Sequence, residues 1–158
     1  MAALLTKLMV EAAVDILKPG VENLIKSTNR VVAYIYVLDP IQDRSMSSEP
    51  VQIWGGSIGL TDRLQWPKPY SEYAWKKADL TWKTQLPSHL VQRDAPYLFE
   101  EGDFKYGGSE YRNGIIVATS GLEWHHDYLV SASLAAILHA MAIGAFETEL
   151  KKESYYIG

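Results

Sequence analysis

The chain contains no cysteine, and this absence excludes disulfide bridges, thiol nucleophiles and cysteine-based zinc sites. It is compatible with a cytoplasmic protein, which is the location we expect. An excess of basic residues is also missing, because 15 Lys and Arg stand against 19 Asp and Glu, for a formal net charge of −4. We therefore expect no nucleic-acid partner, since binding to phosphates relies on a basic surface.

The sequence offers no clear targeting or membrane segment. Met1–Val10 lacks an uninterrupted apolar core and is soon followed by acidic residues, so an amphipathic helix is expected there rather than a signal peptide. The longest apolar stretch, Leu129–Phe146, is interrupted by two serines and a histidine and has no basic flank on its N-terminal side. We therefore expect no membrane span.

The motifs of common catalytic classes are missing as well. The sequence has no His-Glu-x-x-His zinc motif, no phosphate-binding loop and no Gly-x-Ser-x-Gly elbow. With 158 residues and no internal repeat, the chain is predicted to form one domain, 1–158, large enough to bury a core. Composition and motifs leave the reaction, if there is one, undefined.

Three runs of β-branched and apolar residues predict strands. Val31–Leu38 and Val51–Trp54 are expected to pair as an antiparallel hairpin with a long connection. Gly114–Thr119 is a third, short apolar run that ends in a small-residue turn, which is typical of a buried strand. The segment 85–111 is irregular and is expected to contain turns, short strands and functional residues.

Periodic apolar residues predict helices at both ends of the chain and one between. The first helix either ends at Pro19-Gly20 or continues as a second short helix, Val21–Lys26. A middle helix is expected over Ser71–Lys83, with Ser71 as its N-cap. The last helix should run from about His126 to Leu150. The predicted fold class is therefore α+β, an antiparallel sheet flanked by N-terminal, middle and C-terminal helices.

The last helix is apolar nearly all round in its middle. A helix of this kind needs cover on more than one side, and in so small a domain another subunit can supply it. The 126–146 helix is therefore predicted to be the contact surface of a homo-oligomer.

Three stretches in order resemble the GlcG/HbpS-like family, which includes the C-terminal domain of PduO-type proteins and haem-binding or haem-degrading members. The first is Val31–Asp39, a strand that ends in Asp. The second is Ser71–Leu90, where Ala-Trp-Lys-Lys-Ala resembles the family's Ala-x-x-Lys-Ala helix. The third runs from Tyr106-Gly107-Gly108 to Ser120-Gly121, with Asp127 opening the last helix. The resemblance implies a profilin-like α/β/α domain, a homo-oligomer and haem as a candidate cofactor.

The cluster His125-His126-Asp127 is the most suggestive chemistry in the sequence. Imidazoles can bind metal or haem iron and can move protons near neutral pH, so His126 and Asp127 are a candidate catalytic acid–base pair. Adjacent helical residues diverge by about 100°, so the two histidines are not expected to share one metal, and no metal site is predicted. The alternative is that His125 or Asp127 caps the helix.

Four further positions are candidate ligand contacts. His89 lies in a turn after the middle helix and is either a cofactor ligand or a surface residue. Lys77 is the family-like helix lysine, which could pair with a ligand carboxylate or could be a solvated side chain. Gly107 and Gly108 could let backbone amides approach an anion, or could form an ordinary turn. His139 is predicted to be a hydrogen-bonded core or interface residue.

Three functions remain open from the sequence. The first is a homo-oligomeric protein that binds a small molecule, such as haem or another flat or acidic metabolite, with aromatic residues between Trp54 and Trp124 lining the pocket. The second is a small enzyme that uses His126 and Asp127 on an organic metabolite. The third is an oligomeric structural or interaction protein without catalysis.

Overall fold

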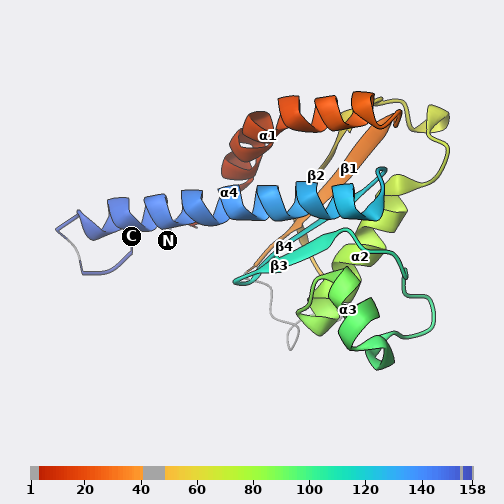
Figure 1. The fold of residues 1–158 in the computed structure, drawn as a ribbon. Coiled ribbons are helices and arrows are strands. Elements are labelled where there is room, and N and C mark those ends of the chain that lie inside the picture. The colour runs from red at the N-terminus through yellow and green to blue at the C-terminus, as the bar shows by residue number, and fades with distance from the viewer. Residues whose placement is uncertain (1–3, 41–48, 154, 158) are drawn as a thin grey trace.

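A computed structural model describes residues 4–40, 49–153 and 155–157. Within these ranges, four strands form one sheet in the order β2-β1-β4-β3, and every neighbouring pair is antiparallel. The elements in chain order are α1 (Lys7–Ser27), β1 (Val32–Leu38), β2 (Gln52–Gly59), η1 (Arg63–Gln65), α2 (Tyr70–Thr84), α3 (Ser88–Asp94), η2 (Pro96–Leu98), β3 (Ser109–Arg112), β4 (Ile115–Ser120) and α4 (Trp124–Leu150). The predicted α+β class is confirmed (Figure 1).

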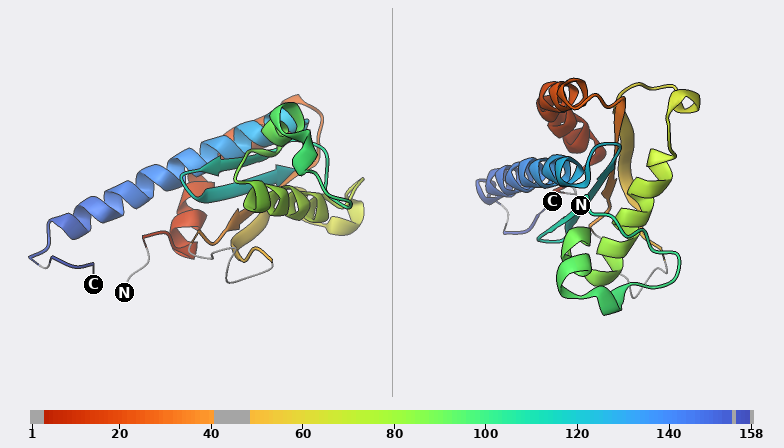
Figure 2. Two further views of the ribbon diagram at one scale, coloured as in Figure 1. Left: turned by 90° about the horizontal axis from the view of Figure 1, so that it is seen from below. Right: turned by 45° about the vertical axis from the view of Figure 1, so that its right-hand side comes forward.

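The sheet separates two apolar layers, because successive strand residues point to opposite faces. In β1, Ala33, Ile35 and Val37 pack with α1 and α4 in one cluster. Tyr34, the residue between two of them, lies in a cluster with Tyr70 and other residues on the α2 side. Figure 2 shows α1 and α4 on one side of the sheet and α2 on the other. The α/β/α layering implied by the family resemblance is therefore present.

The strand pairs agree with the prediction except in extent. β1 and β2 form the expected antiparallel pair, but β2 continues through Gly55 and Gly56 to Gly59, beyond the predicted end at Trp54. The two glycines lie opposite Tyr36 and Ile35, and a Cβ at Gly55 would lie 2.7 Å from the Tyr36 ring. The glycines therefore make room for aromatic rings on the strand. The predicted long connection falls mainly on 41–48, outside the described residues.

The first helix does not end at Pro19-Gly20, so the predicted break there is wrong. α1 continues from Lys7 to Ser27 with Pro19 inside it, and Figure 1 shows the helix changing direction along its length. Proline removes one backbone donor and bends a helix. Buried residues on both sides of the proline, Val14 and Val21, attach the two halves to the core and keep the helix continuous.

The middle of the chain is more helical than predicted. α2 begins at Tyr70, one residue before Ser71, and the N-cap residue of the helix is Pro69, which makes no side-chain capping bond. The predicted N-cap at Ser71 is therefore wrong. A short helix, α3, and β3 then occupy the segment expected to be irregular. Ala74 and Ala78 of α2 are fully buried, which agrees with close packing of this helix on the sheet.

Only the first half of α4 rests on the sheet. Its buried residues fall between Asp127 and Leu138, whereas the second half projects beyond the sheet (Figures 1 and 2). Within the described residues, α4 is the one helix long and apolar enough to cross a membrane by length and composition. A helix that packs on the core of a domain can meet the same criterion, and the first half of α4 does so.

Candidate functional site

The centre of the site is a buried ion pair that joins α2 to α4. Lys77 Nζ lies 3.1 Å from Asp127 Oδ2, and both side chains are only 2% exposed. Lys77 also donates to the carbonyl oxygen of Thr119 on β4, at 2.9 Å. The other carboxylate oxygen, Asp127 Oδ1, accepts from the backbone N–H of Leu122 at 3.0 Å. The pair therefore fixes both helices to the end of β4.

Burial shifts the proton affinity of both partners towards their neutral forms. Removal from water disfavours a charged group, so burial lowers the pKa of Lys77, although the charge of Asp127 opposes this. Burial also raises the pKa of Asp127 to about 7, against the opposing effects of Lys77 and of the Leu122 amide. Proton transfer between the two groups is consequently much easier than between the same groups in water.

The Gly107-Gly108 segment before β3 lies against this pair. Gly108 has a φ of +134°, and a Cβ there would lie 2.8 Å from Lys77 Nζ and 2.8 Å from the Thr119 carbonyl. The Gly108 carbonyl accepts a hydrogen bond from Ser131 Oγ on α4 at 2.7 Å. Only glycine therefore permits this close approach at position 108. The two glycines form irregular backbone that leads directly into β3 and not the ordinary turn that was the alternative.

A cavity of about 310 Å³ opens onto the ion pair. It lies between the N-terminal ends of α2 and α4, at the end of β4, and it includes Lys77 and Asp127 in its lining. Five of the other lining residues are aromatic: Tyr70, Tyr73, Phe104, Tyr106 and Trp124. Phe104 stacks on Tyr73, with ring centroids 4.5 Å apart and an angle of 21° between the planes. A cavity with apolar walls and a few converging polar groups is the usual form of a small-molecule site.

Charged residues surround the mouth of the cavity. Arg30, before β1, pairs with Glu123 at the start of α4, and both line the cavity together with Lys68. Each of the two carboxylates in the lining, Glu123 and Asp127, therefore has its own cationic partner. Lys68 adds a further positive charge, so the cavity has a net attraction for an anionic group.

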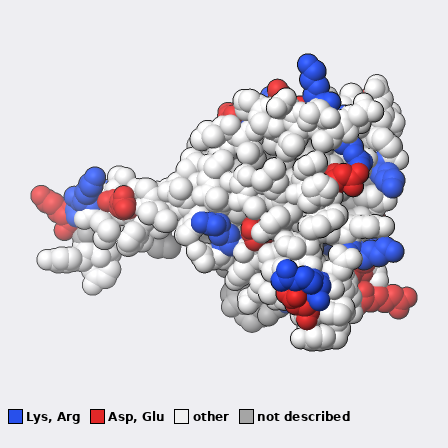
Figure 3. Space-filling model, in the orientation of Figure 1, with Lys and Arg blue, Asp and Glu red and all other residues white. Residues whose placement is uncertain are grey.

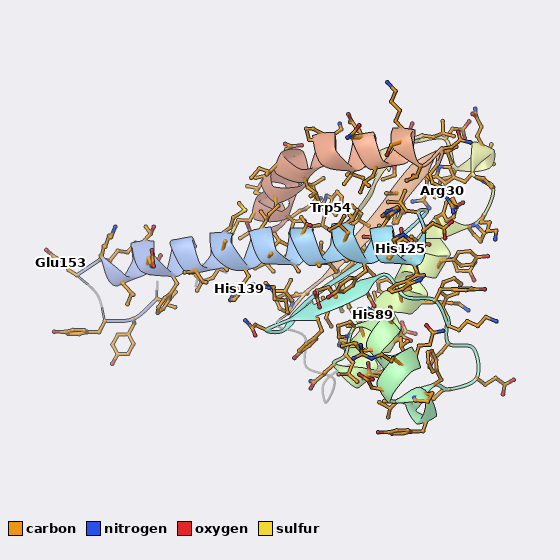
Figure 4. All side chains as sticks on the ribbon, in the orientation of Figure 1. Arg30, Trp54, His89, His125, His139 and Glu153 are labelled. Atoms are coloured by element: carbon orange, nitrogen blue, oxygen red, sulfur yellow. The ribbon has the colours of Figure 1, made fainter. Side chains whose placement is uncertain are left out.

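The histidines lie beside the cavity rather than in its lining. The His89 ring lies 4.3 Å from that of Tyr128 and 5.5 Å from that of Trp124, and burial lowers the pKa of His89. The ring of His125 contacts those of Trp124 and His126. Figure 4 shows Arg30, His89 and His125 around the N-terminal end of α4, with His139 further along the helix.

The predicted catalytic partners do not contact each other through their side chains in the described residues. Asp127 is held by Lys77 and Leu122, while Nδ1 of His126 is buried without a hydrogen-bond partner among these residues. No group of three His, Asp or Glu side chains in the described part of the chain is arranged to hold a metal ion. His139 contacts Arg112 and Asn113, at the β3–β4 turn.

The structure brings together part of the predicted site. Lys77 and Asp127 line the cavity, and Gly108 lies behind them without lining it. Gly107 is also outside the lining and lies between His89 and Trp124, since a Cβ placed on it would be 2.9 Å from an atom of each. Sequence reasoning missed Arg30, Glu123 and the loop aromatics. The one signal for the aromatics was their concentration between Trp54 and Trp124, which suggested an aromatic pocket.

The fold and the cavity define a class: an α+β domain with an open antiparallel sheet between helical layers and a small-molecule-sized cavity where α2 and α4 begin. No family model matches the chain, and no curated protein has a significantly similar sequence. Solved structures do share the fold. The Ybr137w protein aligns over 85% of this chain and 79% of its own, at 12% identity and a TM-score of 0.58.

Protein ORFY of Klebsiella pneumoniae, described with the family model DUF336, aligns over 82% of this chain and 89% of its own, at 16% identity and a TM-score of 0.53. The predicted resemblance is thereby confirmed at the level of the fold. A complex of PduOC with haem aligns over 82% of this chain and 88% of its own, at 17% identity and a TM-score of 0.49, and is too distant to inform the ligand of this chain.

Proposed function

We propose that this protein binds a small, flat organic anion in the Lys77–Asp127 cavity and that it works as a homo-oligomer. The observation that carries the first part is the buried ion pair at the floor of an aromatic cavity. A buried ion pair often contributes less stability than apolar residues of the same volume. Its place in the lining of a cavity therefore favours a role in binding or chemistry.

The shape and charge of the ligand follow from the walls. Aromatic side chains favour stacked and edge-to-face contacts with other rings, and Tyr106 and Trp124 are both partly exposed at the cavity. A planar ligand can lie between such rings. Its acidic group would face Lys68 at the mouth, because Arg30 is already paired with Glu123 and a carboxylate is stabilised most by a cation that is not already neutralised.

Haem belongs to this class of ligand, but a histidine-ligated haem does not fit the cavity. Among the described residues that line it there is no histidine, whereas three tyrosines do line it: Tyr70, Tyr73 and Tyr106. Tyrosine is a known axial ligand of haem iron. A haem in this cavity would therefore be held through a phenol oxygen, with its propionates towards the cations at the mouth.

Titration with hemin and with 2-naphthoate tests the binding site. We expect saturable binding of at least one probe, seen as a shifted Soret band or as quenched tryptophan fluorescence. Replacing Tyr106 with alanine should weaken binding about two- to twelvefold, since one aromatic contact contributes about 0.5–1.5 kcal/mol. Tyr97→Ala is the matched control, because Tyr97 is exposed on η2 and does not line the cavity. Equal affinities for both variants would refute the site.

The assembly proposal rests on the uncovered part of α4. Between residues 128 and 146 the sequence has no Asp, Glu, Lys or Arg, and Leu129, Ile143 and Phe146 are exposed. Figure 3 shows few charged side chains over the face from which the helix emerges. Exposed apolar surface of this extent is typical of protein interfaces. A second copy of the chain is the occupant that we propose.

A further inference from the structure

We propose that Lys77 forms a Schiff base with the carbonyl group of an aldehyde or ketone bound in the cavity, and that Asp127 carries the protons of this reaction. The proposal rests on the proposed function, because it specifies the chemistry of the ligand bound at the same site. It assigns a reaction class that depends on neither His126 nor a metal ion.

The surroundings of Lys77 suit an amine nucleophile. An amine attacks a carbonyl only in its neutral form, and enzymes obtain this form by removing a lysine from water. Lys77 is 2% exposed, and its carboxylate partner 3.1 Å away can accept the extra proton. The lowered pKa of the lysine and the raised pKa of Asp127 agree with this transfer.

The contacts of Lys77 leave one direction open. Within the described residues its Nζ has two hydrogen-bond acceptors, Thr119 O and Asp127 Oδ2, whereas an ammonium group has three donors. Nζ also lies 5.6 Å from the centre of the Phe104 ring, which forms part of the cavity wall. A lysine that served only to join two helices would not need to line a cavity.

The reaction balances with these two groups alone. Asp127 takes a proton from the Lys77 ammonium, and the amine lone pair then forms a C–N bond to the carbonyl carbon while Asp127 returns the proton to the oxygen. Asp127 next removes a proton from the nitrogen, which gives a neutral carbinolamine. The same proton passes to the hydroxyl group, which leaves as water. The products are a protonated imine on Lys77, a carboxylate on Asp127 and one water molecule.

Other lysines near the site lack these surroundings. Lys68 lies at the mouth of the cavity but is exposed, so water solvates its ammonium group. Lys76, the next residue in α2, is partly exposed and donates to the carbonyl of Gly102 at 3.3 Å. These two residues are internal controls for nonspecific modification, since aldehydes also react slowly with surface amines.

Reductive trapping tests the proposal. The wild-type protein is incubated with 4-carboxybenzaldehyde, a flat anionic aldehyde, in the presence of cyanoborohydride, and the adduct is then located by tandem mass spectrometry. We expect one reduced adduct per chain, on Lys77, at aldehyde concentrations that leave Lys68 and Lys76 unmodified. Because the adduct is mapped on the wild-type protein, the result does not depend on a variant that fails to fold.

Two results would overturn the proposal. Absence of an adduct at Lys77, or an adduct distributed equally over the three lysines, contradicts a Schiff base at this site. Binding of 4-(hydroxymethyl)benzoate, the corresponding alcohol, which has no aldehyde group to attack, is measured in parallel by tryptophan fluorescence. If the alcohol binds but the aldehyde is not trapped, the proposed binding function stands and the covalent chemistry fails. If neither binds and no adduct forms, both fail.

The variant Asp127→Asn tests whether Asp127 carries the protons of the reaction. In Asp127→Asn the amide can neither accept nor return the protons of the addition and dehydration steps, so trapping at Lys77 should slow at least tenfold at pH 7, although loss of the carboxylate lowers the pKa of Lys77 further. Lys76→Arg should leave trapping at Lys77 unchanged. Circular dichroism on each variant verifies the fold, and a rate in Asp127→Asn equal to that of the wild type would contradict the role of Asp127.

Discussion

Gly108 is the residue at which backbone conformation and the site depend most directly on each other. Its φ of +134° is rarely adopted by residues with a side chain, and a Cβ would lie 2.8 Å from a backbone oxygen as well as from Lys77 Nζ. We expect Gly108→Ala to lower the free energy of unfolding by about 2–4 kcal/mol, combining backbone strain with overpacking. Chemical denaturation measures this change.

Gly114→Ala is the matched control for that prediction. Gly114 also has a positive φ, +89°, but nothing lies within 4 Å of a Cβ placed there. It should therefore show the cost of the backbone conformation alone, about 1–3 kcal/mol. An equal loss for both variants would mean that the contacts of Gly108 with Lys77 and Thr119 contribute nothing to stability.

Asp127 makes stability depend on pH in an unusual direction. Its pKa rises from 3.8 to about 7 on folding, so the folded chain binds the proton more tightly than the unfolded chain does. This stabilisation is complete below pH 4 and is lost as the pH rises through about 7. The stability of the wild type relative to Asp127→Asn should therefore fall across this window, by up to about 1.4 kcal/mol per pH unit.

Denaturation curves at several pH values between 4 and 8 measure that difference. Asp15→Asn serves as the control, because Asp15 is exposed on α1 and the mutation leaves the buried pair intact. A difference between wild type and Asp127→Asn that stays constant over the window would contradict the raised pKa.

At the scale of the elements, α1 contains one glycine, Gly20, that lowers the stability of the helix. Gly20 lies in the interior of this helix, is exposed, and has no atom within 4 Å of the position that a Cβ would occupy. Glycine in a helix interior is about 0.5–1 kcal/mol less favourable than alanine. Gly20→Ala should therefore raise the free energy of unfolding by this amount, seen as a higher midpoint in thermal denaturation.

Gly55→Ala provides the opposite case. This glycine lies in β2, where a Cβ would come within 2.7 Å of the Tyr36 ring, so the substitution should destabilise the protein. Stabilisation by Gly55→Ala, or loss of stability in Gly20→Ala, would show that the described packing around these two glycines is wrong.

The strands β1 and β2 show how far local sequence predicts an element. The run Val31–Leu38 predicts β1 well because its β-branched and aromatic residues have the strand preference. Gly55 and Gly56 favour a turn by local preference, yet they continue β2 because this segment pairs with β1, where Gly55 lies opposite Tyr36 and Gly56 opposite Ile35. Pro19 misleads for the same reason, since packing on both sides of it keeps α1 continuous.

The site was predictable only as separate residues. Lys77 and Asp127 were both identified, but they are 50 positions apart and their pairing depends on how α2 and α4 meet at β4. The expected partner, His126, is adjacent in sequence, and the divergence of neighbouring helical side chains separates the two groups. Sequence proximity therefore indicated the wrong pair.

At the scale of the whole molecule, the two halves of α4 face different surroundings. The first half is buried against the sheet up to Leu138, which prevents this part from entering a bilayer without unfolding the core. The residues after Phe146 include three Glu and two Lys and so form no basic segment, whereas the surface of a cytoplasmic membrane leaflet attracts basic segments. Both features favour contact with another protein surface over contact with lipid.

A second copy of the chain is the simplest protein partner, and disrupting its contact should reduce the mass of the particle. Ile143 and Phe146 are 47% and 42% exposed on the projecting half of α4. We expect multi-angle light scattering to give a fixed oligomer for the wild type and a monomer for Ile143→Glu combined with Phe146→Glu, because a buried unpaired charge is strongly unfavourable. Leu64→Glu, at a side chain 95% exposed on η1, should leave the oligomer intact. A monomeric wild type that floats with phosphatidylserine vesicles would instead assign the same surface to a membrane, whereas a monomer that does not float would leave the apolar half of α4 without the partner proposed for it.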